Sequence, residues 1–142
     1  MMSTERPGTL HCIATVAMLA LASAGCGAGS EPPKDASQQA ASKFLEDLRA
    51  GKVEAAWQET STEFKSLMGL GSLKDYVKAH PALKAPAEFA EVRNIEREGH
   101  FMAECKFHSS AKVKGKSAPA MIDVIVGSSD GGEWKVEKLS VQ

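Results

Sequence analysis

From residue 89 to the C-terminus, apolar and polar residues alternate with a period of two, which is the pattern of β-strands with one buried face. Three glycines divide this segment at an even spacing of 16 residues. Because glycine accepts the positive φ of tight hairpins, Glu98-Gly99, Lys114-Gly115 and Asp130-Gly131 are predicted turns. The C-terminal half is therefore expected to form a four-stranded antiparallel meander that twists and curls strongly.

The second and third predicted strands divide their side chains clearly between two faces. In the second strand the inward residues are Phe101, Ala103, Cys105 and Phe107. In the third strand, Ala120, Ile122, Val124 and Val126 point inward, while Met121, Asp123 and Ile125 point outward. The last strand changes parity between Val136 and Leu139, which predicts a β-bulge near Glu137 or Lys138.

Before residue 81, apolar residues recur at three- and four-residue steps, which predicts helices. The first is expected to run from Asp35 to a stop at Gly51, and a short second helix covers 53–57. Helices followed by a curled antiparallel sheet constitute an α+β fold.

Two more short helices are expected before the sheet. One is capped at residues 61–62 and ends at Gly69 and Gly71. The other begins at Ser72 and ends before the segment 81–86, because its first proline disfavours helical backbone in the residue that precedes it. That segment is predicted to be a connecting loop.

A different pattern precedes the helices. Residues 12–24 are an uninterrupted run of 13 apolar or small residues that follows Arg6. This is the layout of a secretory signal peptide, and the run is shorter than the about 20 residues that span a bilayer. Residues 1–25 are therefore predicted to be a signal peptide, and the protein is expected to be exported.

The end of this run, Leu21-Ala22-Ser23-Ala24-Gly25-Cys26, resembles the lipobox of bacterial lipoproteins. Its last three residues match that motif, whereas Ser23 stands where the motif most often has Leu. The resemblance implies a membrane anchor on Cys26, made of a diacylglycerol thioether and an amide-linked acyl chain such as palmitate. Gly27 replaces the Asp that signals inner-membrane retention, which favours an outer membrane. The alternative is ordinary cleavage after Ala24, which leaves Cys26 as a free thiol.

Removal of the signal leaves Cys26 and Cys105, so no disulfide framework is expected. Residues 26–34 are rich in Gly, Ser and Pro and lack periodicity, which predicts a flexible tether. The remaining segment, 35–142, has 108 residues and is long enough for one core without a metal or disulfide.

Composition agrees with a single soluble domain, since 25% of the 142 residues are charged and 43% are hydrophobic. The formal net charge is -1, which provides no surplus positive charge with which to hold nucleic acid or anionic lipid. Nucleic acid is therefore not an expected partner.

The order of elements, the segment 44–52 leading to Ala56-Trp57, and the final segment 132–141 resemble the nuclear-transport-factor-2-like (NTF2-like, or cystatin-like) superfamily, in particular its small secreted bacterial lipoproteins. The likeness spans roughly residues 36–142. It implies a cone-shaped sheet around a pocket, in a superfamily that contains enzymes, carriers and dimerising modules.

Enzymatic members would need acidic or His side chains inside the apolar pocket, and none is predicted there. Asp123 is expected in solvent on the outer face. His100 and His108 share a strand face but stand about 26 Å apart, too far for one metal. Cys105 alternates with phenylalanines, so it is interpreted as a core residue and not a nucleophile. No catalytic residue, metal or cofactor is predicted.

Charged residues cluster near the predicted hairpins. Lys106, Lys112, Lys114 and Lys116 are expected to form cross-strand pairs with Glu88, Glu91, Glu96 and Glu98, each contributing at most about 1 kcal/mol. A contact point for phosphate-bearing surfaces is the alternative for these lysines.

Aromatic residues supply the candidate binding site. The residues predicted to line a pocket between helices and sheet, or simply to fill it, are Phe44, Trp57, Tyr76, Phe101, Phe107 and Trp134. A second apolar cluster on the outer face, Met102, Met121 and Ile125, predicts a sheet-to-sheet homodimer.

The leading hypothesis is a non-catalytic, lipid-anchored envelope protein that binds a partner protein or a small apolar ligand. The alternative is a small enzyme (lyase, isomerase or hydrolase) working in the cone, which the family resemblance alone suggests.

Overall fold

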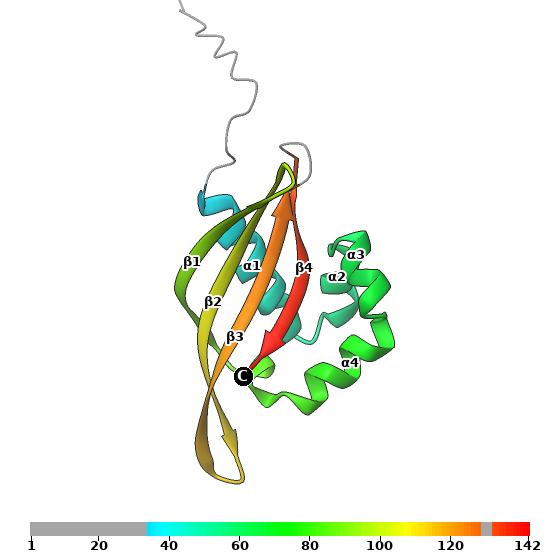
Figure 1. The fold of residues 1–142 in the computed structure, drawn as a ribbon. Coiled ribbons are helices and arrows are strands. Elements are labelled where there is room, and N and C mark those ends of the chain that lie inside the picture. Colours follow the sequence, from blue (N-terminus) through cyan, green and yellow to red (C-terminus); the bar gives the residue numbers. More distant parts are fainter. Residues whose placement is uncertain (1–33, 129–131) are drawn as a thin grey trace, which may run out of the picture.

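The computed structural model describes residues 34–128 and 132–142. Helices occupy the first half of this chain and an antiparallel sheet the second (Figure 1). The helices are α1 (Lys34–Arg49), α2 (Val53–Gln58), α3 (Thr62–Leu67), α4 (Leu70–Ala79) and the 3-10 helix η1 (Pro81–Lys84). The strands, in their order across the sheet, are β1 (Ala87–Arg97), β2 (His100–Val113), β3 (Lys116–Ser128) and β4 (Trp134–Val141). The predicted α+β meander is confirmed.

Two of the three predicted hairpin turns are present as expected. Glu98 and Gly99 have φ values of 53° and 79°, and Lys114 and Gly115 have 50° and 78°. Two successive residues with positive φ are the conformation that a two-residue hairpin of matching twist requires. The third predicted turn, Asp130-Gly131, lies outside the described residues, as do the predicted signal peptide and Cys26.

The helical half differs from expectation in two places. Gly71 was expected to end a helix but lies inside α4, which begins at Leu70 after Gly69. Leu73 and Val77 of α4 are buried, and this packing outweighs the cost of one glycine in a first turn. The predicted loop 81–86 contains η1, whose Leu83 is buried in the core.

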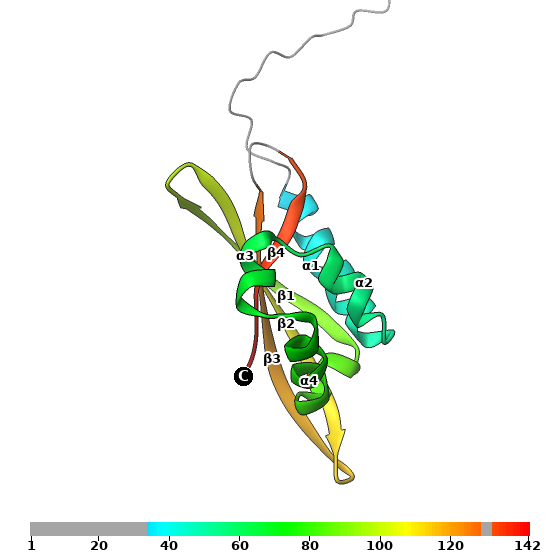
Figure 2. The same cartoon turned by 90° about the vertical axis from the view of Figure 1, so that its right-hand side faces the viewer.

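The helices cover the concave face of the curled sheet. Figures 1 and 2 show α1 lying along this face, with α2, α3 and α4 following on the side of β4. Six of the residues predicted to point inward are buried in one core with Phe44, Leu45 and Leu48 of α1, namely Ala103, Cys105, Phe107, Ile122, Val124 and Val126. The other two, Phe101 and Ala120, are half-buried, and Phe101 is not part of that core. The predicted alternation is therefore confirmed in β2 and β3.

The free edge of β4 is covered by the helical half. The Ser61 amide donates to the Val136 carbonyl at 3.0 Å, and the Val141 amide donates to the Tyr76 hydroxyl at 3.1 Å. These two bonds satisfy edge groups that would otherwise be open to pairing with another chain. The opposite edge strand, β1, is largely exposed and carries charged residues.

The predicted bulge in β4 is confirmed. Ile125 pairs with Lys138 while Val126 pairs with Val136, so Glu137 is the extra residue. The Glu137 carboxylate lies over Gly127, where a Cβ atom would stand 1.9 Å from Oε1. Burial is the main cause that raises the pKa of Glu137, and the nearby Glu63 adds to it. A second register shift, between Phe89 and Glu91, was not predicted.

Candidate functional site

The six aromatic residues predicted to line a pocket do not share one environment. Phe44 and Phe107 are buried, with exposed fractions of 4% and 2%. The Phe44 ring meets Phe64 edge-on at 6.0 Å between centroids, and the Phe107 ring meets Phe89 at 5.7 Å. Phe44 and Phe107 therefore belong to the core, and Phe107 also lines a cavity of about 260 Å³ between α1, η1 and the sheet.

Trp57 and Tyr76 are half-buried and hold the helical segments in place. The Trp57 indole N–H donates to the Met68 carbonyl at 2.9 Å. The Tyr76 hydroxyl accepts from the Val141 amide, and the Tyr76 ring lies 4.0 Å from the His80 ring. The Trp57 indole N–H and the Tyr76 hydroxyl are therefore already hydrogen-bonded within the fold.

A groove of about 660 Å³ lies between α1, α2 and the first half of β4. Two of the predicted pocket residues, Phe44 and Trp134, line it, together with Ala40, Ala56 and Val136. Phe101, Trp57, Tyr76 and Phe107 do not. The apolar floor of the groove is thus formed by residues of α1 and α2 and by the inward residues of β4. Charged residues form the rim of the groove.

Trp134, one of the residues that line the groove, carries a polar atom in its indole ring. Its Nε1 is buried and has no hydrogen-bond partner among the described residues. A buried donor without an acceptor costs about 1–3 kcal/mol. An oxygen acceptor that comes within hydrogen-bond distance of this nitrogen would remove that cost.

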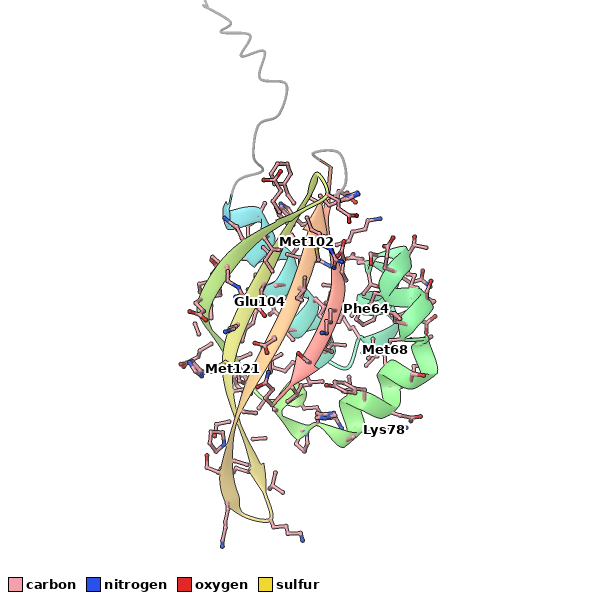
Figure 3. The ribbon with its side chains drawn as sticks, viewed as in Figure 1. Phe64, Met68, Lys78, Met102, Glu104 and Met121 are labelled. Atoms are coloured by element: carbon pink, nitrogen blue, oxygen red, sulfur yellow. The ribbon has the colours of Figure 1, made fainter. Side chains whose placement is uncertain are left out.

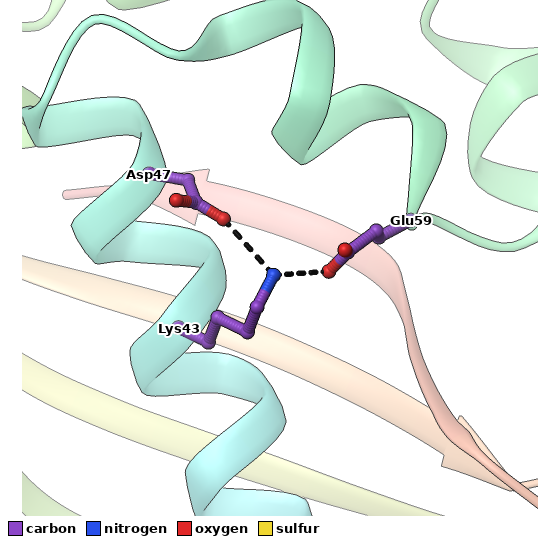
Figure 4. Close-up of polar contacts among 3 residues, drawn as sticks. All are labelled: Lys43, Asp47 and Glu59. Atoms are coloured by element: carbon purple, nitrogen blue, oxygen red, sulfur yellow. Dashed lines mark hydrogen bonds and ion pairs between the residues drawn. The ribbon is translucent and has the colours of Figure 1, made fainter.

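The rim of the groove carries an ion-pair cluster. Lys43 of α1 binds Asp47 at 3.1 Å, one turn along its own helix, and also Glu59, the residue that follows α2 (Figure 4). Hydrogen bonds to Glu59 and then to Asp47 raise the pKa of Lys43. The spacing of Lys43 and Asp47 is visible in the sequence, whereas Glu59 is brought in only by the turn between α1 and α2.

Cys105 is a core residue, as predicted. Its side chain is fully buried. Burial raises the pKa of its thiol to about 11, and a hydrogen bond with Ser37 offsets part of that shift. A thiol with so little thiolate near neutral pH is a poor nucleophile.

Asp123 lies on the outer face of the sheet, as its parity predicts, but the expectation that it is solvated is wrong. Its exposed fraction is 8%. The Gln142 amide donates to its Oδ2 at 2.9 Å, while its Oδ1 has no hydrogen-bond partner among the described residues. Gln142 continues the pairing of β4 opposite Met121, so the C-terminal residue covers this carboxylate. Strand parity fixes a side chain's face but does not show what else covers that face.

The predicted dimer face is divided by charge. Met102, Met121 and Ile125 lie on the outer face and are half-buried. Figure 3 labels Met102 and Met121 on the two central strands. Asp123 stands between Met121 and Ile125 on β3, and Glu104 pairs directly with Ile125 across the strands. Glu104 also forms an ion pair with Arg93 at 2.7 Å. The homodimer stays a prediction, on a face that alternates apolar and ionic groups.

The predicted charge pairs are present only in part. Lys106 binds Glu91 at 3.0 Å, and this contact raises the pKa of Lys106. The other three lysines of the group lie at the β2–β3 turn, whereas Glu96 and Glu98 lie at the β1–β2 turn. These turns are at opposite ends of β2, so the expected pairing between them is wrong (Figure 1).

Among residues 34–128 and 132–142, no group of three or more His, Cys, Asp or Glu side chains has the geometry to hold a metal ion. His100 and His108 are exposed. His80 follows α4, and its Nδ1 lies 2.8 Å from the Tyr76 carbonyl oxygen.

Among residues 34–128 and 132–142, no helix has both the length and the apolar character needed to cross a membrane.

Solved structures share this arrangement of helices and sheet. A chain whose name begins Rd1NTF2_05 has a TM-score of 0.53 at 11% identity, over 76% of this chain and 98% of that chain. A structure from Catenulispora Acidiphila has a TM-score of 0.54 at 10% identity, over 76% and 88%. An NTF2-like protein with a cystatin-like fold from Novosphingobium aromaticivorans has a TM-score of 0.45 at 8% identity, over 74% and 80%. No protein-family model matches the chain, and no curated protein matches it.

The fold is therefore NTF2-like, as the resemblance in the sequence predicted. At these identities the likeness concerns the fold and says nothing about the ligand or reaction.

Proposed function

We propose that this protein is a non-catalytic lipoprotein of the cell envelope, anchored through lipid on Cys26, whose NTF2-like domain binds a small apolar ligand in the groove between α1, α2 and β4. The observation that carries the binding part is the set of apolar residues lining the groove together with the Trp134 indole N–H, a buried donor without a partner among residues 34–128 and 132–142. Binding sites for small molecules typically combine an apolar lining with a few placed polar groups. A ligand with an apolar body and a single carbonyl or ether oxygen fits this lining.

The placement of the ionisable groups supports a binding role over the enzymatic alternative. Among residues 34–128 and 132–142, the buried inward residues of β2 and β3 include one titratable group, the Cys105 thiol, and its raised pKa keeps it protonated at neutral pH. Asp123, His100 and His108 lie on the outer face, away from the groove. The carboxylates of Asp47 and Glu59 do line the groove, but both are paired with Lys43 at its rim. A general acid or base must lie within hydrogen-bond reach of the group it serves.

Filling the groove tests the binding part. Ala40→Phe places a ring on the floor, and we expect it to weaken the binding of the neutral apolar probe N-phenyl-1-naphthylamine by about tenfold, because the probe loses its buried contact area. Probe fluorescence, titrated against the full-length chain, is the measurement. Trp134→Phe keeps the ring and tests the indole N–H with ligands that carry an oxygen acceptor.

The matched control is Ala55→Phe, which adds the same ring at an exposed position of α2 outside the groove. Its probe affinity should equal that of the unaltered chain. Equal loss in both variants, or equal binding by all three proteins, would contradict a ligand site in the groove and leave the partner protein as the occupant.

The anchor is tested separately. Cys26→Ala removes the sulfur to which lipid is attached, so we expect the protein to move from the membrane pellet to the soluble fraction. Fractionation and immunoblotting of cells that express each form measure this. Cys105→Ala is the control, since a buried thiol in the core takes no part in anchoring. Membrane association that persists in Cys26→Ala would refute the anchor without affecting the groove.

A further inference from the structure

A second cleft, of about 470 Å³, lies where the C-terminal end of α1 meets α2 and α4. Among the described residues that line it, four different segments contribute basic residues, and Glu54 is the one acidic residue. The basic residues are Arg49, Lys52, Lys74, Lys78 and Lys84. None of the residues that line the groove beside β4 is shared with this cleft.

These cations are poorly compensated within the fold. Lys52, Lys74 and Lys84 form no ion pair with any residue of 34–128 or 132–142 that the structure describes. Arg49 contacts Glu46 at 3.8 Å, and Lys78 contacts Asp75 at 3.5 Å. Both contacts are long, exposed and within one helix turn, so they offset little of the positive charge.

Helix stabilisation explains only part of this cluster. Arg49 and Lys78 lie in the last turns of α1 and α4, where positive charge is favourable. Lys52 and Lys74 lie in no last turn. Lys74 and Lys78 are also four residues apart on one helix, a spacing at which like charges repel. The fold therefore gathers cations at a cost that an anionic ligand would remove.

The floor of the cleft is apolar. Leu48 and Val77 are buried, and Val53 is half-buried, beneath side chains of the five exposed basic residues. The cleft differs in shape from the β2–β3 hairpin, which projects from the rest of the domain (Figure 1) and carries Lys112, Lys114 and Lys116 at its end. Lys78, one of the residues that line the cleft, is labelled on α4 in Figure 3.

We propose that this cleft binds the phosphate or phosphodiester group of an anionic ligand. The lysine ammonium groups and the Arg49 guanidinium supply charge-assisted hydrogen bonds to phosphate oxygens, and the apolar floor contacts the carbon portion beside the phosphate. The group belongs either to a free phosphorylated molecule or to a phospholipid headgroup, and the two sources are distinguished by experiment. The site is independent of the proposed ligand in the β4 groove.

The test is calorimetric titration of the full-length chain, in neutral detergent, with two probes. Pyrophosphate represents a free phosphorylated molecule, and glycerophosphoglycerol is the deacylated headgroup of phosphatidylglycerol. If only pyrophosphate binds, the ligand is a free phosphorylated molecule. If glycerophosphoglycerol binds, the ligand is a phospholipid headgroup. The affinity should fall steeply between about 20 and 200 mM NaCl, because the charges are exposed.

The double variant Lys52→Glu, Lys74→Glu should weaken binding of the responsive probe by about tenfold or more. Lys112→Glu, Lys116→Glu changes the net charge equally on the exposed hairpin and should retain binding within about twofold. All four positions are exposed, and circular dichroism checks that each variant is folded. Equal losses of affinity in the two double variants would show that binding depends on the net charge of the protein and not on this cleft, which would contradict the proposal. Failure of the unaltered protein to bind either probe would also overturn it.

Discussion

Replacing Phe107 by Ala is expected to lower the free energy of unfolding by about 3–5 kcal/mol, a large part of the total for a domain of this size. Phe107 is 2% exposed and stands in the middle of β2, opposite Ile122 and edge-on to Phe89. Removing the ring takes away its buried apolar area and leaves a cavity that the surrounding strands cannot close.

Urea unfolding followed by tryptophan fluorescence measures this change, since Trp57 and Trp134 report on both halves of the domain. Leu67→Ala is the control, because Leu67 is 84% exposed and its loss should change stability by less than about 0.5 kcal/mol. A loss below about 1 kcal/mol for Phe107→Ala would mean that the concave face of the sheet is not packed as described.

Alkaline pH is expected to destabilise the protein through Cys105. The ordinary pKa of the thiol is 9.0, and burial raises it to about 11 in the folded state. The contribution is therefore fully present below pH 9 and is lost as the pH rises toward 11, because the unfolded chain ionises first. The loss attributable to this one group is on the order of 2–3 kcal/mol.

The comparison that isolates this effect is between the unaltered chain and Cys105→Ala. Lysine and tyrosine titrate in both proteins, so the difference between their unfolding free energies from pH 8 to 11 reports on the thiol. That difference should shrink or change sign as the pH rises. A constant difference across the range would show that the thiol ionises as readily in the folded chain as in the unfolded one.

The turns and strand faces were predictable because they depend on local geometry. Glu98-Gly99 and Lys114-Gly115 adopt the positive φ values that the sequence pairs indicate. The bulge at Glu137 was predictable as well, since Val136 and Leu139 of opposite parity must both face the core. The shift between Phe89 and Glu91 gave no such signal, because most of β1 is exposed and its burial pattern does not alternate.

The candidate binding residues were only partly predictable. Aromatic character indicated burial for Phe44, Phe107 and Trp134, but it did not indicate which rings fill the core and which line the groove. Asp123 was placed on the correct face and in the wrong environment, because its covering residue, Gln142, lies 19 positions away. Such contacts depend on the path of the whole chain and leave no periodic pattern.

The spatial clustering of charged residues was likewise not predictable from the sequence. The net charge of -1 gave no sign of a cleft with five basic residues, because a net charge is a sum over the whole sequence and does not show where the charged residues lie in the fold. Arg49, Lys74 and Lys84 come together only where α1, α4 and η1 meet.

The sequence by itself determined the order of the four α-helices and the four strands, the turns at Glu98-Gly99 and Lys114-Gly115, and the inward face of the two central strands. These features follow from steric limits and apolar spacing within a few residues. Only the tertiary structure decided which aromatic rings line a groove, that Asp123 is covered, and that scattered lysines converge on one cleft. These features arise from contacts between segments distant in the chain, whose geometry is set by packing of the whole domain.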